Sequence, residues 1–225
     1  MIKYHANMIQ GSDEWLSARC GLMTASEMKL IITPTLKVAS NDKERSHLFE
    51  LAAQRITRHV EPKYISDDMM RGHEEEILAR KLYSENFSKV ADCGFITNDK
   101  WGFTIGYSPD GLVGDDGVIE VKSRRQKYQI ETIITDIIPE DYKIQVQTGL
   151  LVSGRKWCDF ISYSGGLPMV TIRVLPDPSV QDAILVAATA FEMRLEKRLM
   201  EYRDIIKTNN RLMPTERTVE TEITI

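Results

Sequence analysis

The residues best suited to chemistry lie in the middle of the chain, in two short segments separated by a glycine-rich turn. The first is a Ser-Pro-Asp-Gly run that contains Asp110, and the second reads Glu120-Val121-Lys122. Side chains two residues apart in a β-strand point to the same face, so Glu120 and Lys122 share a face and Val121 points away from it. Asp110 lies just before a turn and can fold back onto that face. The spacing predicts two carboxylates and one ammonium group at one place.

These groups suit the chemistry of a divalent metal ion and a phosphate. Mg²⁺ prefers oxygen ligands, which the carboxylates of Asp110 and Glu120 and the backbone carbonyl of Val121 can supply. The ammonium of Lys122 can orient or help deprotonate an attacking water, or neutralise charge that develops on phosphate. The alternative is a turn aspartate followed by a solvent-facing charged pair, which is common on strands. The run Val-Ile-Glu-Val at 118–121 favours the site, because a carboxylate inside a core-like strand needs a partner that offsets its desolvation.

An ordered set of motifs resembles a known family. The aspartate and the Glu-Val-Lys run match the PD-(D/E)xK nuclease signature, including the proline before the aspartate. Over roughly residues 10 to 200, the sequence is similar to the phage lambda exonuclease / YqaJ-type viral recombinase family. The matching positions, in chain order, are Trp15, Arg19, Gly21, Thr24 to Glu27, Gly72 to Glu76, Ser108 to Leu112, Glu120 to Lys122 and Gln145 to Gln147. The resemblance implies an α/β protein with a central mixed β-sheet flanked by helices, the PD-(D/E)xK restriction-endonuclease-like nuclease fold.

The resemblance also implies roles for individual residues. Asp110, Glu120 and the carbonyl of Val121 would bind the metal ions, and Lys122 would be the catalytic lysine. The cofactor would be Mg²⁺, with two ions bound and Mn²⁺ able to substitute.

Two helical residues complete the implied active site. Glu76 would be a further acidic residue, although Glu74 and Glu75 beside it leave the register open by one position. Gln145 would lie near the site, and Gly149 one turn later would leave room for a DNA strand. The alternatives are acids that favour the first turn of a helix and an ordinary exposed glutamine.

A second group of residues suits the terminal phosphate of DNA. Arg19 offers a guanidinium fork, and Ser26 lies in the first turn of a helix that Thr24 and Glu27 are expected to cap as a capping box. The resemblance implies that Arg19 and Ser26 hold a 5′ phosphate, with Ser108 in the same neighbourhood. The negative charge of Glu27 opposes this, unless its side chain folds back onto its capping partner.

The implied function is Mg²⁺-dependent, processive 5′-to-3′ degradation of one strand of linear double-stranded DNA. The enzyme would be a phosphodiester hydrolase with a two-metal mechanism that leaves a 3′ single-stranded overhang. Its partners would be double-stranded DNA ends and a single-strand-annealing protein of phage-type recombination. The resemblance further implies a homo-oligomer, a ring-shaped trimer.

Two other functions stay open. One is an endonuclease of the same fold, of the restriction or repair type. The other is a non-catalytic DNA-binding module that uses the cations of one segment, Lys122, Arg124, Arg125 and Lys127, only to bind phosphates. A solvated surface loop is the simpler interpretation of that segment taken alone.

Composition limits the alternatives. The 225 residues are 42% hydrophobic and 28% charged, as in an ordinary globular protein. The net charge of −4 excludes nucleic-acid binding through a globally positive surface, so a polyanion must be bound locally. Three cysteines without a Cys-x-x-Cys spacing argue against a disulfide framework or a zinc site. No uncharged run approaches the roughly 20 residues of a membrane helix, and no secretory signal is readable. We expect a cytoplasmic location, in a bacterial or phage-infected host cell, and no membrane partner.

The elements that position these residues are expected in the order α, β-meander, α, β-hairpin, α. Periodicity and capping residues predict helices at 12–21, 24–30, 41–59, 68–85, 139–152 and 178–207. Strands are predicted at 90–98, 102–107, 118–123, 157–164 and 169–174. In the helix at 68–85, Ile77, Leu78 and Leu82 are expected on the buried side, and the last helix carries an apolar stripe from Val180 to Ile206. We predict a single nuclease domain over residues 1–207 and a polar C-terminal tail over residues 208–225.

Overall fold

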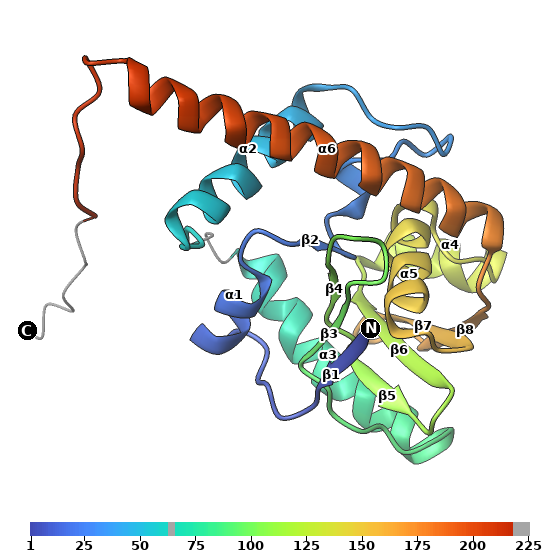
Figure 1. Ribbon diagram of the computed structural model, residues 1–225. Helices are drawn as coiled ribbons and strands as arrows, with labels where there is room; N and C mark the ends of the chain where they lie inside the picture. Colours follow the sequence, from blue (N-terminus) through green and yellow to red (C-terminus); the bar gives the residue numbers. More distant parts are fainter. Residues whose placement is uncertain (63–65, 218–225) are drawn as a thin grey trace, which may run out of the picture.

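The computed structural model describes residues 1–62 and 66–217 (Figure 1). Its strands are β1 (Ile2–His5), β2 (Met23–Thr24), β3 (Phe95–Asn98), β4 (Ile105–Tyr107), β5 (Gly111–Val113), β6 (Gly117–Ser123), β7 (Trp157–Tyr163) and β8 (Val170–Val174). Its helices are α1 (Asp13–Arg19), the 3₁₀ turn η1 (Met28–Leu30), α2 (Asp42–Thr57), α3 (Asp67–Asn86), α4 (Gln126–Thr135), α5 (Glu140–Ser153) and α6 (Pro178–Thr208).

The strands form two four-stranded sheets, in the orders β1-β3-β4-β2 and β5-β6-β7-β8. Both sheets are mixed, because β2 is parallel to β4 and β6 is parallel to β7 while the other pairs are antiparallel. The predicted mixed α/β architecture flanked by helices is therefore confirmed, but the single central sheet is divided in two. The predicted meander is divided with it, since β3 and β4 lie in the first sheet and β6 in the second.

The strand β6 is the most enclosed element of the second sheet. It pairs with β7 over its full length, with Glu120 opposite Phe160. One face, through Ile119 and Val121, packs against Ala79 of α3, and the opposite face joins the larger core beneath α5 and α6. Burial on both faces explains the near-continuous apolar run of this strand. A glutamate in its middle therefore lies in the interior of the protein.

Capping residues account for the starts of three helices. The side chain of Ser12 accepts a hydrogen bond from the first turn of α1, and Asn41 and Asp177 do the same for α2 and α6. The predicted boundaries of these helices are confirmed within a few residues. The stripe of α6 is buried only as far as Leu195, whereas Ile206 is 47% exposed, because the helix continues past the core (Figure 1).

The predicted helix at 24–30 is wrong. Thr24 ends β2 and pairs with Gly106, and the N–H of Ala25 donates to the Gly106 carbonyl at 2.9 Å. Strand pairing therefore replaces the capping role of Thr24, and only the turn η1 follows.

The buried side of α3 was also predicted wrongly. Ile77, Leu78 and Leu82 are 58%, 49% and 38% exposed, whereas Ala79 and Tyr83 are buried. The sequence did not predict β1, β5 or α4 as elements. None of the helices in the described part of the chain is long and apolar enough to cross a membrane. The domain boundary at residue 207 stays a prediction, and residues 218–225 of the predicted tail lie outside the described residues.

Candidate active site

Glu120 is a buried carboxylate at the centre of a hydrogen-bond network. Its side chain is 1% exposed, and Oε1 accepts hydrogen bonds from Lys122 Nζ at 2.7 Å and from Gln145 Nε2. Oε2 accepts from the hydroxyl of Tyr107 at 3.1 Å. Burial, together with the Glu120 charge, raises the pKa of Tyr107 well above its ordinary value, so the phenol keeps its proton and donates. Donors from β6, α5 and β4 thus fix both carboxylate oxygens.

Asp110 reaches the same edge of β6 from the preceding segment. The strand β5 pairs only with residues 117–119 of β6, so β5 leaves the rest of this edge of β6 free for a side chain. Asp110 occupies it, and its Oδ2 accepts a hydrogen bond from the Val121 N–H at 2.6 Å. The carbonyl of a strand residue points to the same edge as its N–H, which directs the Val121 carbonyl toward Asp110. Burial, and then the charges of Glu120 and Glu76, raise the pKa of Asp110 well above its ordinary value. The carboxylates therefore lie close enough to repel one another.

Lys122 is held as an ammonium group. Burial alone would lower the pKa of Lys122, but the carboxylates of Glu120 and Asp110 outweigh burial and raise the pKa above its ordinary value. The geometry therefore suits Lys122 to neutralising negative charge better than to removing a proton from water.

The three consecutive glutamates of α3 occupy different surroundings. Glu76 interacts electrostatically with Glu120, and burial raises the pKa of Glu76 above its ordinary value. Glu75 instead accepts a hydrogen bond from Ser123 Oγ at 2.5 Å, and Glu74 is exposed. Of the three, Glu76 is the one that lies within the electrostatic reach of the Glu120 network.

The donor set fits a divalent cation. The carboxylates of Glu76, Asp110 and Glu120 interact with the Lys122 ammonium, and Arg80 lies 4.0 Å from Glu76. Burial first, and then the neighbouring carboxylates, raise the pKa of Asp110 well above its ordinary value. Carboxylate and carbonyl oxygens are the ligands that Mg²⁺ prefers. A cation bound among these oxygens would offset their repulsion and their desolvation.

Arg19 is the centre of a second polar cluster. Its Cζ lies 4.2 Å from the centroid of the Trp15 ring, and Nη1 donates to Ser108 Oγ at 3.3 Å. Nη2 donates to Thr24 Oγ1 at 3.5 Å, and Ser26 Oγ lies 3.3 Å from that hydroxyl. Burial lowers the pKa of Arg19. The structure thus brings Arg19, Ser108 and, through Thr24, Ser26 into one neighbourhood.

Glu27 lies at the edge of this Arg19 cluster. Its Oε2 accepts a hydrogen bond from Thr24 Oγ1 at 3.0 Å, so the carboxylate does turn toward its expected partner, but onto the hydroxyl rather than the backbone N–H. The expected support from a helix N-terminus behind Ser26 is wrong, because a three-residue 3₁₀ turn stands where the helix was predicted. Anion binding here must depend on the guanidinium and the hydroxyls.

A third cluster was not predicted. Within residues 1–62 and 66–217, one group of three His, Cys, Asp or Glu side chains has ligand atoms that all lie within 4.8 Å of one another: Glu27, His47 and Glu50. His47 is buried, stacks on Phe191 with ring centroids 5.6 Å apart, and lies 3.2 Å from Glu50 Oε2 through Nδ1. The i,i+3 spacing of His47 and Glu50 was the available signal. These residues differ from the predicted metal ligands.

Sequence reasoning also missed Tyr107, and it misread Gly149. A Cβ on Gly149 would lie 2.7 Å from Cζ of Tyr107, so the space beside this glycine is filled by the tyrosine ring that holds Glu120. The signal for Tyr107 was its position directly before Ser108, at the end of a predicted strand.

The fold matches solved exonucleases. An alkaline exonuclease from Laribacter hongkongensis, LHK-Exo, has a TM-score of 0.78 and 32% sequence identity, covering 87% of this chain and 98% of that one. A second structure of LHK-Exo, in complex with dAMP, has a TM-score of 0.78 and 33% identity, with 87% and 99% covered. A phage related exonuclease from Haemophilus somnus 129PT shares the fold, with a TM-score of 0.59, 14% identity, and 80% and 96% covered.

The sequence itself matches a family model. The model of the YqaJ-like viral recombinase domain covers residues 14–156, which include both polar clusters centred on Arg19 and Glu120. No curated protein sequence matches the chain. The matched residues make up more than half of the chain, and the identity to an alkaline exonuclease exceeds 30% over most of its length. The chain belongs to the YqaJ-like viral recombinase domain family.

Proposed function

We propose that the protein is a Mg²⁺-dependent exodeoxyribonuclease that degrades one strand of linear double-stranded DNA in the 5′-to-3′ direction. The observation that carries this proposal is the network that joins the buried Glu120 to Lys122 and lies beside the half-buried Asp110 and Glu76. The fold shared with LHK-Exo, an alkaline exonuclease, supports the proposal.

Asp110, Glu120 and the Val121 carbonyl are the proposed metal ligands, and Glu76 adds a further carboxylate. When bound, Mg²⁺ or Mn²⁺ supplies a Lewis acid that activates water and stabilises charge on the phosphate oxygens, and two ions would serve both sides of the displacement. The hydrogen bonds from Tyr107 and Gln145 keep the Glu120 carboxylate in one orientation.

Lys122 is the proposed electrostatic catalyst. Its ammonium lies beside both carboxylates and keeps its proton, so it can neutralise charge that develops on the scissile phosphate. Gln145, which donates to the same Glu120 oxygen as Lys122, is the proposed positioning residue for DNA and carboxylate.

The Arg19 cluster is the proposed site for the terminal 5′ phosphate. A guanidinium with hydroxyl neighbours binds phosphate oxygens through charge-assisted hydrogen bonds. Ser108 contacts Arg19 and lies two residues before Asp110, so the proposed phosphate site adjoins the proposed metal site. This arrangement supports the 5′-to-3′ direction of degradation.

Four further properties belong to the same proposal. The enzyme acts processively, leaves a 3′ single-stranded overhang for a single-strand-annealing protein, assembles as a ring-shaped trimer and works in the cytoplasm. A ring would retain DNA despite the net charge of −4. Light scattering tests the assembly: a mass of about three times 25.7 kDa is expected, and a monomer that still digests DNA processively would contradict the ring.

The decisive experiment is a time course on linear duplex DNA with one 5′-phosphorylated end, run beside a covalently closed circle of the same sequence. We expect nucleotides to be released from the phosphorylated strand in Mg²⁺ and not in EDTA, while the circle stays intact. Cleavage of the circle would favour the endonuclease. DNA binding without cleavage in Mg²⁺ would favour the non-catalytic module.

A further inference from the structure

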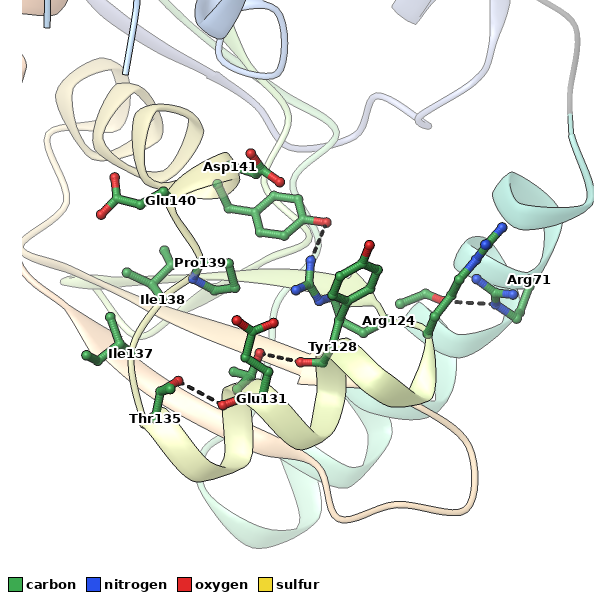
Figure 2. Close-up of a pocket in the computed structure, with 14 residues that line it drawn as sticks. Arg71, Arg124, Tyr128, Glu131, Thr135, Ile137, Ile138, Pro139, Glu140 and Asp141 are labelled. Atoms are coloured by element: carbon green, nitrogen blue, oxygen red, sulfur yellow. Dashed lines mark hydrogen bonds between the residues drawn. The ribbon is translucent and has the colours of Figure 1, made fainter. Parts of the chain in front are cut away.

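A cavity of about 730 Å³ opens at the end of β6, between α4 and the segment that leads into α5 (Figure 2). Its lining changes in character from one end to the other. Arg71, Arg124 and Arg125 line it near Ser123, and Ile137 and Pro139 line it away from Arg71, while the carboxylates of Glu131, Glu140 and Asp141 also line it (Figure 2). The cavity therefore has a cationic end next to β6 and an apolar end away from it, with carboxylates along its wall.

Arg124 lies between two tyrosine rings at the cationic end. Its Cζ is 5.0 Å from the centroid of Tyr128 and 5.2 Å from that of Tyr142, and Nη1 donates to the Tyr142 hydroxyl at 3.1 Å. The Nε atom is buried and has no acceptor among the described residues. A buried guanidinium N–H without an acceptor is costly, and guanidinium groups bind phosphate oxygens through charge-assisted hydrogen bonds.

The second aromatic ring can contact a ligand. Tyr128 is 41% exposed, and Lys127 Nζ lies 4.6 Å from its centroid, so positive charge surrounds a ring that is partly open to solvent. Cations beside exposed aromatic rings are the combination that binds single-stranded nucleic acid, because phosphates contact the cations and bases stack on the rings.

The cavity and the Glu120 network share a wall. The ring centroid of Tyr142 lies 5.2 Å from Arg124 Cζ on the cavity side. The same centroid lies 5.6 Å from Lys122 Nζ on the side of the Glu120 network. The helix α1, which carries Arg19, and α4 lie on opposite sides of β4 in Figure 1. A strand that has its 5′ phosphate at Arg19 and its scissile phosphate beside Lys122 must continue away from Arg19, toward α4.

We propose that this cavity binds the nucleotide on the 3′ side of the scissile bond. Its following phosphate accepts hydrogen bonds from Arg124, and its base leaves the duplex and stacks on Tyr128. The carboxylates of Glu131, Glu140 and Asp141 disfavour a second phosphate, so the cavity holds one nucleotide rather than a continuous run of strand. A volume of about 730 Å³ suits a ligand of that size. The inference rests on the proposed exonuclease function and adds a second subsite to it.

The test compares the effect of removing the base of the second nucleotide with the effect of removing the Tyr128 ring. Single-turnover cleavage in Mg²⁺ is followed on three 5′-phosphorylated duplexes: one intact, one with an abasic site at the second nucleotide, and one with an abasic site at the eighth. The enzymes are wild type, Tyr128→Ala, Tyr128→Phe and Tyr202→Ala. Tyr202 is a matched control, because it is 42% exposed and lies on α6, outside the cavity.

For wild type, Tyr128→Phe and Tyr202→Ala, the abasic site at the second nucleotide should raise the half-saturating enzyme concentration about five- to a hundredfold. Tyr128→Ala should show the same increase on the intact duplex and no further increase on that abasic duplex. The abasic site at the eighth nucleotide should have the same effect on all four enzymes.

Two outcomes would overturn the inference in distinguishable ways. If wild type cleaves the intact duplex and Tyr128→Ala keeps the full abasic effect, the cavity does not bind this base, although the proposed function stands. If wild type releases no nucleotides in Mg²⁺, the proposed function and the subsite fail together.

Discussion

The two polar clusters on either side of Pro109 have opposite charge. In the Arg19 cluster, a half-buried guanidinium is surrounded by the neutral groups of Trp15, Ser108 and Thr24, with one carboxylate at the edge. In the Glu120 network, the carboxylates of Glu76, Asp110 and Glu120 interact with the Lys122 ammonium, and Arg80 lies 4.0 Å from Glu76. Burial of unbalanced charge lowers the stability of a folded protein. The comparison teaches that each cluster suits a ligand of the opposite sign, which would be the proposed phosphate at the first and the proposed cation at the second.

The largest effect on the cleavage rate is expected from substitutions in the Glu120 network. Asp110→Asn and Lys122→Ala should each reduce cleavage about a thousandfold or more, because each removes a charge that the reaction uses. Asp110→Asn should also weaken Mg²⁺ binding, whereas Lys122→Ala should bind both metal and DNA. Cleavage rates and calorimetric Mg²⁺ titrations measure these differences.

The control for these variants is Lys156→Ala, which removes a lysine side chain that is 73% exposed. It should cleave at the wild-type rate. Robust cleavage by purified Asp110→Asn or Lys122→Ala would contradict the site, provided that circular dichroism shows each variant to be folded.

A substitution in the Arg19 cluster should have a smaller effect on the cleavage rate, and one that depends on the 5′ phosphate of the substrate. A charge-assisted hydrogen bond contributes roughly 1.5–3 kcal/mol, so Arg19→Ala should slow cleavage of a 5′-phosphorylated duplex about ten- to a hundredfold. Cleavage of a 5′-hydroxyl duplex should change little, and the Mg²⁺ requirement should stay the same. The rates must be compared at one salt concentration, because phosphate contacts weaken steeply with salt.

Arg211→Ala, which removes an exposed arginine, is the matched control and should keep the wild-type ratio between the two substrates. An Arg19→Ala enzyme that still prefers the phosphorylated end by the full wild-type ratio would show that the phosphate binds elsewhere.

Tyr107 offers a way to sharpen the comparison without changing any charge. Tyr107→Phe removes the hydroxyl that donates to Glu120 Oε2 and should lower the cleavage rate about tenfold, with a higher Mg²⁺ concentration at half-maximal rate. Tyr83→Phe is the control, because it removes a buried hydroxyl that donates to Asp159 at 2.6 Å on the opposite face of the sheet. It should lower the melting temperature but leave the Mg²⁺ dependence unchanged. Equal Mg²⁺ shifts in both variants would exclude a positioning role for Tyr107.

The smallest effect is on stability. A carboxyl with a raised pKa binds its proton more tightly in the folded state, so the metal-free protein should lose stability as pH rises from 3.8, the ordinary pKa of Asp, through the raised pKa of Asp110. Mg²⁺ at a hundredfold excess over its Kd should restore about 2.7 kcal/mol, a shift of several degrees in melting temperature.

Thermal melts in EDTA and in Mg²⁺, at about pH 5.5 and pH 8.5, measure this linkage. Asp110→Asn lacks the titrating group, so its metal-free melting temperature should fall less with pH than that of wild type. An equal fall in both proteins would assign the pH dependence to other groups.

Local spacing predicted the parts of the site that lie on one strand and its preceding turn. Glu120 and Lys122 share a face because strand geometry has a period of two, and Asp110 is near in sequence. The contact of Arg19 with Ser108 joins residues 89 positions apart, and only the resemblance to a family suggested that neighbourhood. The contact between Tyr107 and Gly149 depends on how α5 packs against β4, which no local pattern encodes.

The errors in secondary structure have a similar origin. The Thr24 to Glu27 spacing favours a helix start, but pairing with Gly106 brings Thr24 into a strand. The cation-rich segment after Lys122 suggested a loop, whereas α4 begins there after Arg125 without a side-chain cap to mark its start. In the first case a tertiary contact overrode a local helix signal, and in the second the local signal for a helix start was missing.

The short Ser108-Pro109-Asp110 segment sets the spacing between the Arg19 cluster and the Glu120 network. Two residues of extended chain span at most about 7 Å, and proline at the middle position restricts the backbone between them. One end of the segment touches the guanidinium of Arg19 and the other end holds the carboxylate beside Val121. In the proposed function, a strand whose end phosphate is bound at Arg19 would therefore present its first internal phosphodiester to the carboxylates. Degradation one nucleotide at a time would follow from the shortness of this segment.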